Sequence, residues 1–536
     1  MEKKKLWSAG SGPTAESILA MAVSAFLVIL FLFNAHLLLG PAKKLVKGES
    51  DFEDFVAEIQ LVYSENTVWK EPFVNLSGLV ARATGQKVCN GAIRLNNGML
   101  CFPSEEKQYV YWVGDNLSSF AYYLVEKGVP FLYVQAPCKV DQEGALLPEG
   151  VEYFANADGD DLINYLAANG LYTLDLRPTF SATAEQVGQN FYRTDHHWTF
   201  ETALRACPII VERMDEILRD RTLDAGNVAF DQWEAHTLED WFLGSLGKRV
   251  GVHYGGVDDL TYYTPKFETH MSMAVMNHQE LTVGDFIQAN MRMEYAERKD
   301  YFNDSPYCIY VGGDYPLVQH RNAGAPNQMK VLLIKDSYSL PVQCYLSTVF
   351  SEVDVLDPRY FPLGIESVAE YAAMSQPDIV LMILNPVGGP SSEEYSAFGT
   401  QLEQNREAAM TGKRTVITQG DVEIPMSEKD YSYVVMAENL EPGKRYTFHC
   451  DQVAFLEGGA AADGVMAALY NNGTDNLINN RIFDVEYCNG KDGFTWTFDV
   501  PAQETGQVQF LLYAGMPGKT QGIELTYRNA SLTLEE

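Results

Sequence analysis

Hydrophobic and polar positions divide this 536-residue chain into three parts. The first part contains an apolar run, residues 18–39, which only Ser24, Asn34 and His36 interrupt. A helix of this length crosses about 30 Å of hydrocarbon, so the run predicts a transmembrane anchor within residues 1–47. The run is longer than the core of a typical signal peptide, and no clear small-residue cleavage pattern follows it, which favours an uncleaved anchor.

Helical and strand patterns alternate in the second part, residues 48–404. The helical pattern SSFAYYLVEKG leads into the apolar run FLYVQAP, and DLINYLAANG leads into LYTLDL. This alternation predicts an α/β domain built on a parallel sheet. Between about residues 225 and 310 the pattern is irregular and rich in aromatic residues. This insertion is predicted either to line a binding cleft or simply to pack against the domain.

The third part, residues 405–536, has a different pattern. Segments such as YSYVVMAENL, KRYTFHC and FTWTFDV alternate apolar and polar residues, and Pro-Gly, Asp-Gly and Asn-Gly turns separate them. This pattern predicts an antiparallel β-sandwich. Modules of this kind often bind carbohydrate, and Trp496, Tyr513 and Tyr527 are candidates to stack on sugar rings. An aromatic residue in a strand nevertheless belongs to the core by default.

Candidate chemistry is concentrated in the string YRTDHHWTF, which contains Asp195, His196 and His197. In an extended segment, side chains two positions apart point to the same side. Asp195 and His197 are therefore predicted to meet one nucleophile, while His196 faces away. A carboxylate that orients an imidazole base is two thirds of a catalytic triad.

A nucleophile is predicted at Ser337. The run MKVLLI indicates a buried strand, KDSYS a turn, and LPVQCYLSTVF a helix with proline near its first position. This position exposes the hydroxyl and directs the amides of a helix N-terminus toward any oxyanion formed on it. In the predicted triad Ser337 attacks an ester carbonyl, His197 takes and returns the proton, and Asp195 fixes the imidazole tautomer.

Two motifs resemble a known family. TDHHWT is similar to the TD-x-HWT signature of the AlgX and AlgJ group of alginate O-acetylation proteins, its DHHW form resembles the bacterial DHHW family, and KDSYS resembles their serine motif. The resemblance covers roughly residues 60 to 400 and implies a circularly permuted SGNH hydrolase-like fold with flavodoxin-like layers. It also implies acetyl transfer to an extracytoplasmic polysaccharide, with Ser337, His197 and Asp195 as catalytic residues. The Lys-Asp-Ser form of the serine motif departs from the family pattern.

Candidates for oxyanion donors and substrate contacts follow from the local pattern. Gly312 and Gly313, in YVGGDYP, would let backbone amides approach an oxyanion closely. Asn385 ends an apolar strand pattern, and Arg359 and Tyr360 follow the strand pattern EVDVL. Loops at the carboxyl ends of parallel strands hold ligands in open α/β sheets, so Arg359 and Tyr360 are candidates to bind a sugar hydroxyl or a carboxylate. Glycine turns and strand-end asparagines are also common without a catalytic role.

The Asp-His-His string has further interpretations. The histidines are also compatible with a core pair capped by Asp195, or with zinc ligands, because zinc binds imidazole and carboxylate. A DHH phosphoesterase would need further metal-binding aspartate motifs upstream, and the acidic run at residues 158–161 is a poor substitute. The serine turn and the flanking Trp198 and Thr199 favour the triad. We expect neither a metal nor a cofactor.

Composition limits the partners and the cysteine chemistry. The formal net charge of -33 argues against binding nucleic acid, whose phosphates would be repelled. Cys89 and Cys101 flank the turn-rich segment NGAIRLNNGML and are spaced for a hairpin disulfide. Four further cysteines lie within or beside apolar runs and are predicted to be buried thiols. These are Cys138, Cys207, Cys308 and Cys344.

Three functions remain open. The first is a membrane-anchored O-acetyltransferase that carries acetyl on Ser337, receives it with the help of a membrane-embedded acyl-transfer partner, and delivers it to a cell-surface or exported polysaccharide. The second is an SGNH-type carbohydrate acetylesterase with the same triad. The third is a non-catalytic glycan-binding assembly protein.

Three lysines precede the apolar run and three follow it, so the charge bias that would set the orientation of the helix in the membrane is nearly balanced. The family resemblance places the catalytic domain outside the cytoplasm.

Overall fold

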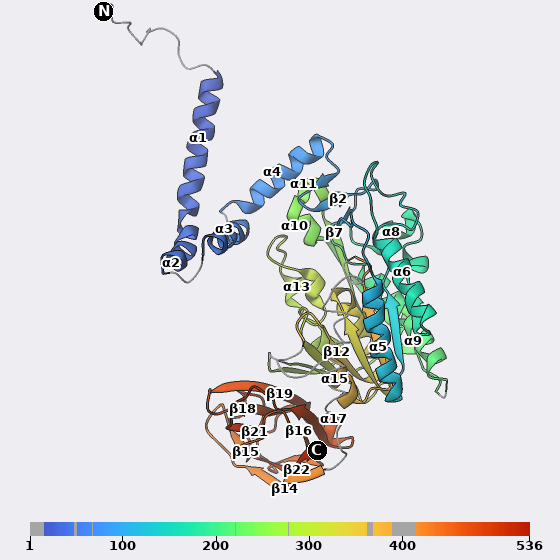
Figure 1. Cartoon of the computed structure of the whole chain (residues 1–536), viewed down its shortest axis with the longest axis vertical. Helices are drawn as coiled ribbons and strands as arrows, with labels where there is room; N and C mark the ends of the chain where they lie inside the picture. Colours follow the sequence, from blue (N-terminus) through green and yellow to red (C-terminus); the bar gives the residue numbers. More distant parts are fainter. Residues whose placement is uncertain are drawn as a thin grey trace, which may run out of the picture. The chain divides into compact units, whose positions relative to one another are not determined.

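A computed structural model describes residues 15–47, 51–66, 68–219, 221–276, 278–361, 368–387 and 414–535. The chain divides into two compact units (Figure 1). The first comprises residues 1–86 with 250–254, and the second comprises residues 87–249 and 255–536. The predicted boundary at residues 404 and 405 lies outside the described residues, so that domain limit stays a prediction.

The first unit is helical. Its elements are α1 (Ala15–Asn34), the 3-10 helix η1 (Ala35–Leu38), α2 (Leu39–Lys47), α3 (Phe52–Asn66) and α4 (Lys70–Ala83). With about 1.5 Å of rise per residue, the 20 residues of α1 extend about 30 Å. Its apolar side chains, such as Phe31 and Leu32, are largely exposed. In the described chain one helical stretch, Val23–Lys47, is long and apolar enough to cross a membrane, judged by length and composition.

The second unit contains a mixed eight-stranded sheet with the order β5-β4-β13-β11-β12-β10-β8-β9. Five neighbouring strands are parallel: β5 (Tyr172–Asp175), β4 (Phe131–Gln135), β13 (Ile379–Leu384), β11 (Asn327–Lys335) and β12 (Phe350–Leu356). The other three pair antiparallel: β10 (Leu317–Arg321), β8 (Met271–Val275) and β9 (Glu280–Gly284). The predicted parallel sheet is therefore correct for one part only, because β10 and two strands of the insertion, β8 and β9, add an antiparallel edge.

Helices cover both faces of this sheet. One apolar core joins Leu333 and Ile383 of the sheet to α9 (Phe200–Ile217) and α14 (Leu340–Leu346). A second core joins the opposite faces of β11 and β13 to α5 (Tyr111–Glu126), α6 (Ala155–Ala168) and α15 (Val368–Ser375). Successive strand residues point to opposite faces, which is why the fully apolar strands contribute to both cores. The predicted three-layer α/β fold is confirmed.

The C-terminal region forms two antiparallel sheets (orange to red in Figure 1). One contains β14 (Arg414–Ile424), β22 (Leu525–Glu535), β16 (Arg445–Cys450), β20 (Phe494–Asp499) and β17 (Gln452–Phe455). The other contains β15 (Tyr433–Ala437), β21 (Val508–Tyr513), β18 (Gly464–Asn471) and β19 (Asn476–Asp484). The side chains of Trp496, Tyr513 and Tyr527, the candidates for stacking on sugar rings, are only 5, 9 and 1% exposed. These rings are therefore packed in the core.

The predicted hairpin disulfide is wrong. Cys89 lies in β1 (Val88–Cys89) and Cys101 in β3 (Leu100–Cys101), and both strands pair with β2 (Ala92–Arg94), which lies between them. Two strand spacings separate the cysteines by about 9–10 Å, whereas a disulfide needs Cα atoms within about 7 Å. All eight cysteines of the chain are free thiols. Of the four predicted buried thiols, three are fully buried and Cys308 is half-buried.

Candidate active site

Asp195 and His197 lie in a segment of bends, residues 193–197, that leads into α9. Thr199 ends this segment as the N-cap of α9, because its hydroxyl accepts a hydrogen bond from the Thr202 amide at 3.2 Å. The Oδ1 atom of Asp195 accepts from the His197 amide at 3.0 Å and lies 2.5 Å from His197 Nδ1. The carboxylate therefore fixes both the backbone and the ring of His197.

Ser337 lies on the turn that follows β11. The turn is a 3-10 helix, η5 (Ser337–Ser339), and α14 begins directly after it. Asp336 caps the turn, since its Oδ1 atom accepts from the Tyr338 amide at 2.9 Å. Ser337 is half-buried between buried neighbours, so its hydroxyl is accessible at a fixed position.

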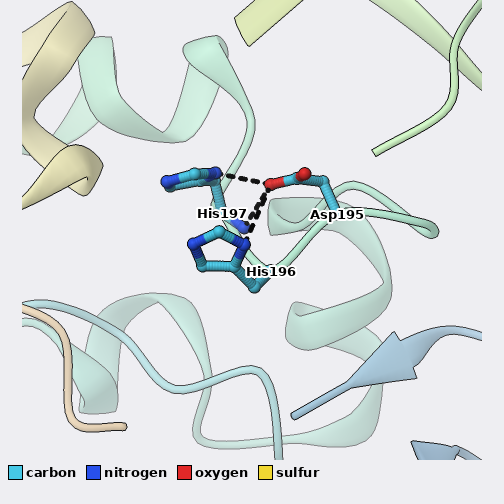
Figure 2. A group of neighbouring side chains, drawn as sticks. All are labelled: Asp195, His196 and His197. Atoms are coloured by element: carbon cyan, nitrogen blue, oxygen red, sulfur yellow. Dashed lines mark hydrogen bonds and ion pairs between the residues drawn. The ribbon is translucent and has the colours of Figure 1, made fainter. Parts of the chain in front are cut away.

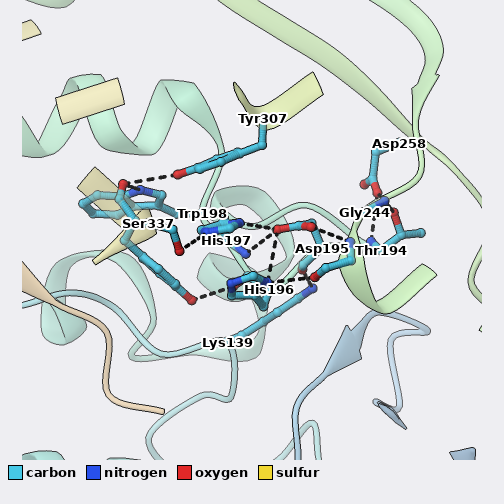
Figure 3. Close-up of polar contacts among 12 residues, drawn as sticks. Lys139, Thr194, Asp195, His196, His197, Trp198, Gly244, Asp258, Tyr307 and Ser337 are labelled. Atoms are coloured by element: carbon cyan, nitrogen blue, oxygen red, sulfur yellow. Dashed lines mark hydrogen bonds and ion pairs between the residues drawn. The ribbon is translucent and has the colours of Figure 1, made fainter. Parts of the chain in front are cut away.

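The two segments meet at the serine hydroxyl. The Nε2 atom of His197 lies 2.8 Å from Ser337 Oγ (Figure 3). Asp195 and His197 are 3 and 6% exposed, so the contacts between the three side chains are largely shielded from water. The structure thus brings together the three residues that the sequence predicts as a triad. Their catalytic role stays a prediction.

The second carboxylate oxygen of Asp195 is also bound. Asp195 Oδ2 accepts from the Ser245 amide at 2.6 Å. Burial alone would raise the pKa of Asp195, but interactions with His197 and His196 and the hydrogen bond from Ser245 hold that pKa well below its usual range. Asp195 is therefore a carboxylate at neutral pH, as the orienting member of a triad must be.

His196 does not face away from the pair, which corrects the prediction. Its ring lies beside that of His197 (Figure 2), with centroids 3.7 Å apart. Its Nδ1 atom lies 2.8 Å from Ser245 Oγ. The prediction assumed an extended segment, whereas these residues form bends that rotate successive side chains toward one side. Burial, followed by the neighbouring His197, lowers the pKa of His196 to about 3, so this ring is neutral at physiological pH.

Aromatic rings and the Asp195 backbone are held by further contacts. The Tyr307 ring stacks on His197 with centroids 3.9 Å apart and an interplanar angle of 10°. Trp198 Nε1 donates to the Tyr338 carbonyl at 2.9 Å, which ties the histidine segment to the serine turn. The Lys139 ammonium donates to the Asp195 carbonyl (Figure 3). These contacts restrict both reacting side chains to one geometry.

The predicted oxyanion donors have different positions. The Gly312 amide donates to the carbonyls of Cys308 and Tyr310 at 3.0 and 2.8 Å, so it is unavailable to an oxyanion in this structure. Gly313 has φ of 152° and open space where a β-carbon would lie. Asp314, the next residue, binds Lys335, which places this segment beside the serine turn. Gly313 therefore stays a candidate donor.

Asn385 directly follows β13, the strand next to β11, and supports the serine turn from there. Its amide and its Nδ2 atom donate to Asp336 Oδ2 at 2.7 and 2.5 Å. Its Oδ1 atom accepts from the Val387 amide at 2.8 Å. In this geometry Asn385 acts on Ser337 through Asp336, and its predicted role as a direct oxyanion donor stays untested.

Arg359 and Tyr360 belong to a charged cluster at the same strand ends. Arg359 contacts Asp357 and Asp314 at 2.6 and 3.0 Å, and the buried Lys335 binds the same two carboxylates. Burial would raise the pKa of Asp314, but Lys335 and Arg359 hold it below its usual value. Tyr360 is 52% exposed beside the Arg359 guanidinium. Both residues are thus accessible, as predicted substrate contacts would have to be.

Asp195, His196 and His197 also form a group whose ligand atoms lie within 4.8 Å of one another, close enough for a metal ion (Figure 2). Imidazole and carboxylate suit zinc. In this structure, however, Asp195 Oδ1 and His197 Nδ1 form a hydrogen bond with each other, and His196 Nδ1 contacts the Ser245 hydroxyl. This arrangement suits orientation of a base, and the expected absence of a metal stays a prediction.

Residues 112–256 match the family model described as the SGNH hydrolase-like domain of acetyltransferase AlgX. This segment is therefore similar to the SGNH hydrolase-like domain of AlgX. It contains Asp195 and His197, whereas Ser337 lies outside the matched residues. The predicted resemblance to the AlgX and AlgJ group is confirmed.

Several solved structures are similar to the chain at low identity. PatB1 of Bacillus cereus with a sulfonyl adduct has 20% identity over 57% of this chain and 96% of that chain, with a TM-score of 0.45. A DHHW family protein from Eubacterium siraeum has 18% identity over 58% and 96%, with a TM-score of 0.42. AlgX of Pseudomonas aeruginosa has 15% identity over 82% and 94%, with a TM-score of 0.34. No curated protein matches the chain.

Three residues that support the site carry no motif of their own. Ser245 and Tyr307 come from the irregular insertion, and Lys139 follows β4, so only the tertiary structure brings them to the histidines. Asp336 does have a signal in the sequence. An aspartate directly before a strand-to-helix turn is a favoured cap, and Lys335-Asp336-Ser337 has that form.

Proposed function

We propose that the protein is a polysaccharide O-acetyltransferase with Ser337 as nucleophile, His197 as general base and Asp195 as orienting carboxylate. The observation that carries this proposal is the contact series from Asp195 through His197 to Ser337, with distances of 2.5 and 2.8 Å. The match of residues 112–256 to the AlgX acetyltransferase domain supports acetyl transfer as the reaction.

The proposed reaction has two halves. In the first, Ser337 Oγ forms a bond to the acetyl carbonyl carbon of a donor ester while His197 Nε2 takes the hydroxyl proton. The donor carbon–oxygen bond then breaks, and the imidazolium gives the proton to the leaving oxygen. In the second half a polysaccharide hydroxyl gives its proton to His197 and attacks the acetyl-serine carbonyl. The acetyl–Oγ bond then breaks, and the imidazolium returns the proton to Ser337 Oγ. Asp195 stabilises the imidazolium in both halves.

We propose the amides of Ser337 and Gly313 as donors to the oxyanion. Within the part of the chain that the structure describes, neither amide donates a hydrogen bond to another residue. Such preorganised donors are worth roughly 3 kcal/mol each in known acyl-transfer enzymes. Arg359 and Tyr360, at the same end of the sheet, are proposed to hold the acceptor sugar.

We further propose that residues 1–47 anchor the protein in a membrane with the catalytic domain outside the cytoplasm. The exposed apolar surface of α1 and its length of about 30 Å support an anchor. A membrane-embedded acyl-transfer protein is the proposed source of acetyl groups, because such a partner would deliver them next to an anchored domain.

The proposal is tested with the full-length protein in detergent. The protein is incubated with 4-nitrophenyl acetate, with and without unacetylated oligosaccharides, and compared with Ser337→Ala by mass spectrometry. Acetyl on Ser337 and acetylated oligosaccharide in the wild type, both lost in Ser337→Ala, would support the transferase. Release to water alone, unaffected by acceptors, would indicate an esterase. No acyl-enzyme and no release would contradict both and favour a glycan-binding assembly protein.

A further inference from the structure

A polar cavity lies where the sandwich packs against the eight-stranded sheet, within the second compact unit. Two adjoining cavities of about 300 and 520 Å³ share Lys330, Glu352 and Arg481 in their walls. Volumes in this range are typical of sites for small molecules. Around the cavity the two domains share an apolar core, which includes Ala274 of β8 and Ile482 of β19. The polar wall of the cavity therefore lies beside an apolar contact between the two domains.

The floor of the cavity is one row of side chains across four neighbouring strands. Lys330 of β11 lies opposite Glu352 of β12, Glu352 lies opposite Arg321 of β10, and Arg321 lies opposite Ser272 of β8. Residues in register across a sheet point to the same face. Two positions along β12, the buried Asp354 contacts Arg321 at 2.7 Å and Lys330 at 3.3 Å. These two cations are thus held in place by carboxylates of the sheet.

Arg481 of β19 forms the opposite wall and is differently placed. It donates one hydrogen bond, at 3.2 Å, to the Tyr371 hydroxyl. Within the described chain its guanidinium forms no ion pair, and the charge of the buried Asp354 acts on it only from beyond ion-pair distance. A guanidinium has five N–H donors in a planar fork that matches the oxygens of carboxylate or phosphate. The donors of Arg481 other than the one that Tyr371 accepts therefore suit an anionic group inside the cavity.

Hydroxyl and carboxylate groups supply the rest of the wall. Ser272 Oγ is buried and has no hydrogen-bond partner within the described chain, and it lines the smaller cavity. A buried polar atom without a partner is rare in native proteins and is satisfied when a bound molecule supplies one. Glu352 and Asp492 line both cavities. Carboxylate oxygens can accept hydrogen bonds from the hydroxyl groups of a ligand. A ligand that fits both features carries an anion and several hydroxyls.

This cavity is separate from the proposed active site. Lys330 lies in the first half of β11, and Ser337 follows the other end of that strand. Seven positions of extended chain correspond to roughly 20 Å. A molecule in the cavity therefore cannot reach the serine hydroxyl, and its binding is independent of acyl chemistry.

We propose that this cavity is a second ligand site, which binds a small polyhydroxylated anion such as a sugar acid or a sugar phosphate. Arg481 binds the oxyanion, and Ser272 and the wall carboxylates bind the hydroxyls. Sugar acids and sugar phosphates share this chemistry, and the two are separated by experiment.

The test is isothermal titration calorimetry of the full-length protein in detergent with three probes: D-glucuronate, D-glucose 6-phosphate and the neutral D-glucose. The variant Arg481→Gln should weaken binding of the anionic probe by at least about tenfold, since it removes a charge-assisted hydrogen bond. Arg528→Gln is the matched control, because Arg528 pairs with Asp421 on the exposed part of the sandwich and does not line either cavity. Thermal melting shows whether each variant folds.

Ser272→Ala gives a second test that does not depend on the fold of the arginine variant. The hydroxyl has no partner to lose, so the melting temperature should stay unchanged while binding weakens by about 2- to 10-fold. Stronger binding of glucuronate would identify a sugar acid, and stronger binding of glucose 6-phosphate a sugar phosphate. The proposal would be overturned if neither glucuronate nor glucose 6-phosphate bound, or if neutral glucose bound as tightly as the anionic probe. It would also be overturned if folded Arg481→Gln bound the anionic probe with unchanged affinity. Ser337→Ala should leave binding unchanged, which separates this result from the proposed acyl transfer.

Discussion

His197 Nε2 lies 2.8 Å from Ser337 Oγ, although 140 positions of sequence separate the two residues. The histidine comes from the bends before α9, and the serine from the turn after β11. A general base must reach the proton that it removes at about this distance. The pairing therefore gives the catalytic proposal its geometric basis, and it can be tested one residue at a time.

Ser337→Ala should abolish the acetyl-enzyme and lower turnover by on the order of 10³-fold or more, because no other hydroxyl occupies the position of the nucleophile. The matched control is Ser339→Ala. Ser339 Oγ is buried without a hydrogen-bond partner in the described chain, so its loss costs no contact with the triad. Acetate release and the mass of the acetylated protein report both results. Equal activity in wild type and Ser337→Ala would remove this serine from the mechanism.

His197→Ala and His196→Ala should differ strongly. His197 contacts both Asp195 and Ser337, whereas His196 contacts Ser245 and stays neutral with a pKa lowered to about 3. We expect a loss of several orders of magnitude for His197→Ala and less than about tenfold for His196→Ala. Turnover and melting temperature are measured together. Equal losses in both variants would point instead to metal binding or to a structural pair.

Gly244→Ala should impair the site through Asp195. A β-carbon at Gly244 would overlap with the backbone and Cβ of Asp195, which is buried and cannot shift freely. We expect lower turnover and a loss of about 1–3 kcal/mol in stability, as for overpacked sites. Gly188→Ala is the control, because Gly188 lies in α8 (Ala184–Asn190) and a β-carbon added there would meet open space. That change should stabilise the helix by about 0.5–1 kcal/mol and leave turnover unchanged.

The sequence predicts most of the site because its motifs have clear local signals. The apolar run before Lys335 and the proline after Ser339 define the serine turn, and Asp195 lies two positions from His197. What it misses depends on tertiary structure. The bends at residues 193–197 bring His196 beside His197, and no periodic pattern indicates such bends.

The sheet shows the same limit. The strands β8 and β9 lie within the insertion, where apolar alternation is too short to indicate an antiparallel edge. Ser245 and Tyr307 contact Asp195 and His197 because the insertion packs against the domain, and the sequence pattern does not indicate this packing. Likewise, the spacing of Cys89 and Cys101 in the sequence fits a two-stranded hairpin as well as a three-stranded meander. Only the pairing of β2 with both β1 and β3 shows that β2 separates the two cysteines.

Asp336→Ala should destabilise the serine turn. The Asp336 carboxylate accepts from the amides of Tyr338 and Asn385 and from Asn385 Nδ2, and the alanine variant leaves these donors without a partner. We expect a loss of about 2 kcal/mol or more, together with lower turnover. Asp336→Asn keeps one acceptor oxygen and should lose less. Melting temperatures and acetate release provide the comparison, and an unchanged melting temperature in Asp336→Ala would exclude the capping role.

His320 should make stability depend on pH. It is fully buried in β10, and burial lowers its pKa to about 4. Its ring nitrogens lie 3.0 Å from Asn290 Oδ1 and 3.3 Å from Gln343 Oε1. An unfolded histidine takes up a proton near pH 6.5. Between pH 6.5 and about 4 the unfolded state therefore binds one proton more than the folded state, so stability falls as pH falls through this window.

The slope expected from this one residue is roughly 1 kcal/mol per pH unit, and above pH 6.5 the contribution disappears. Urea unfolding of the wild type and of His320→Gln at pH 7.5, 6.0 and 5.0 measures the contribution of His320. The difference between the two proteins isolates this residue, because carboxylates and other histidines contribute equally to the stability of both. Glutamine keeps a hydrogen-bonding side chain but does not titrate. The wild type should lose more stability on acidification than His320→Gln does. Parallel pH dependence in the two proteins would show that His320 is protonated equally in the folded and unfolded states.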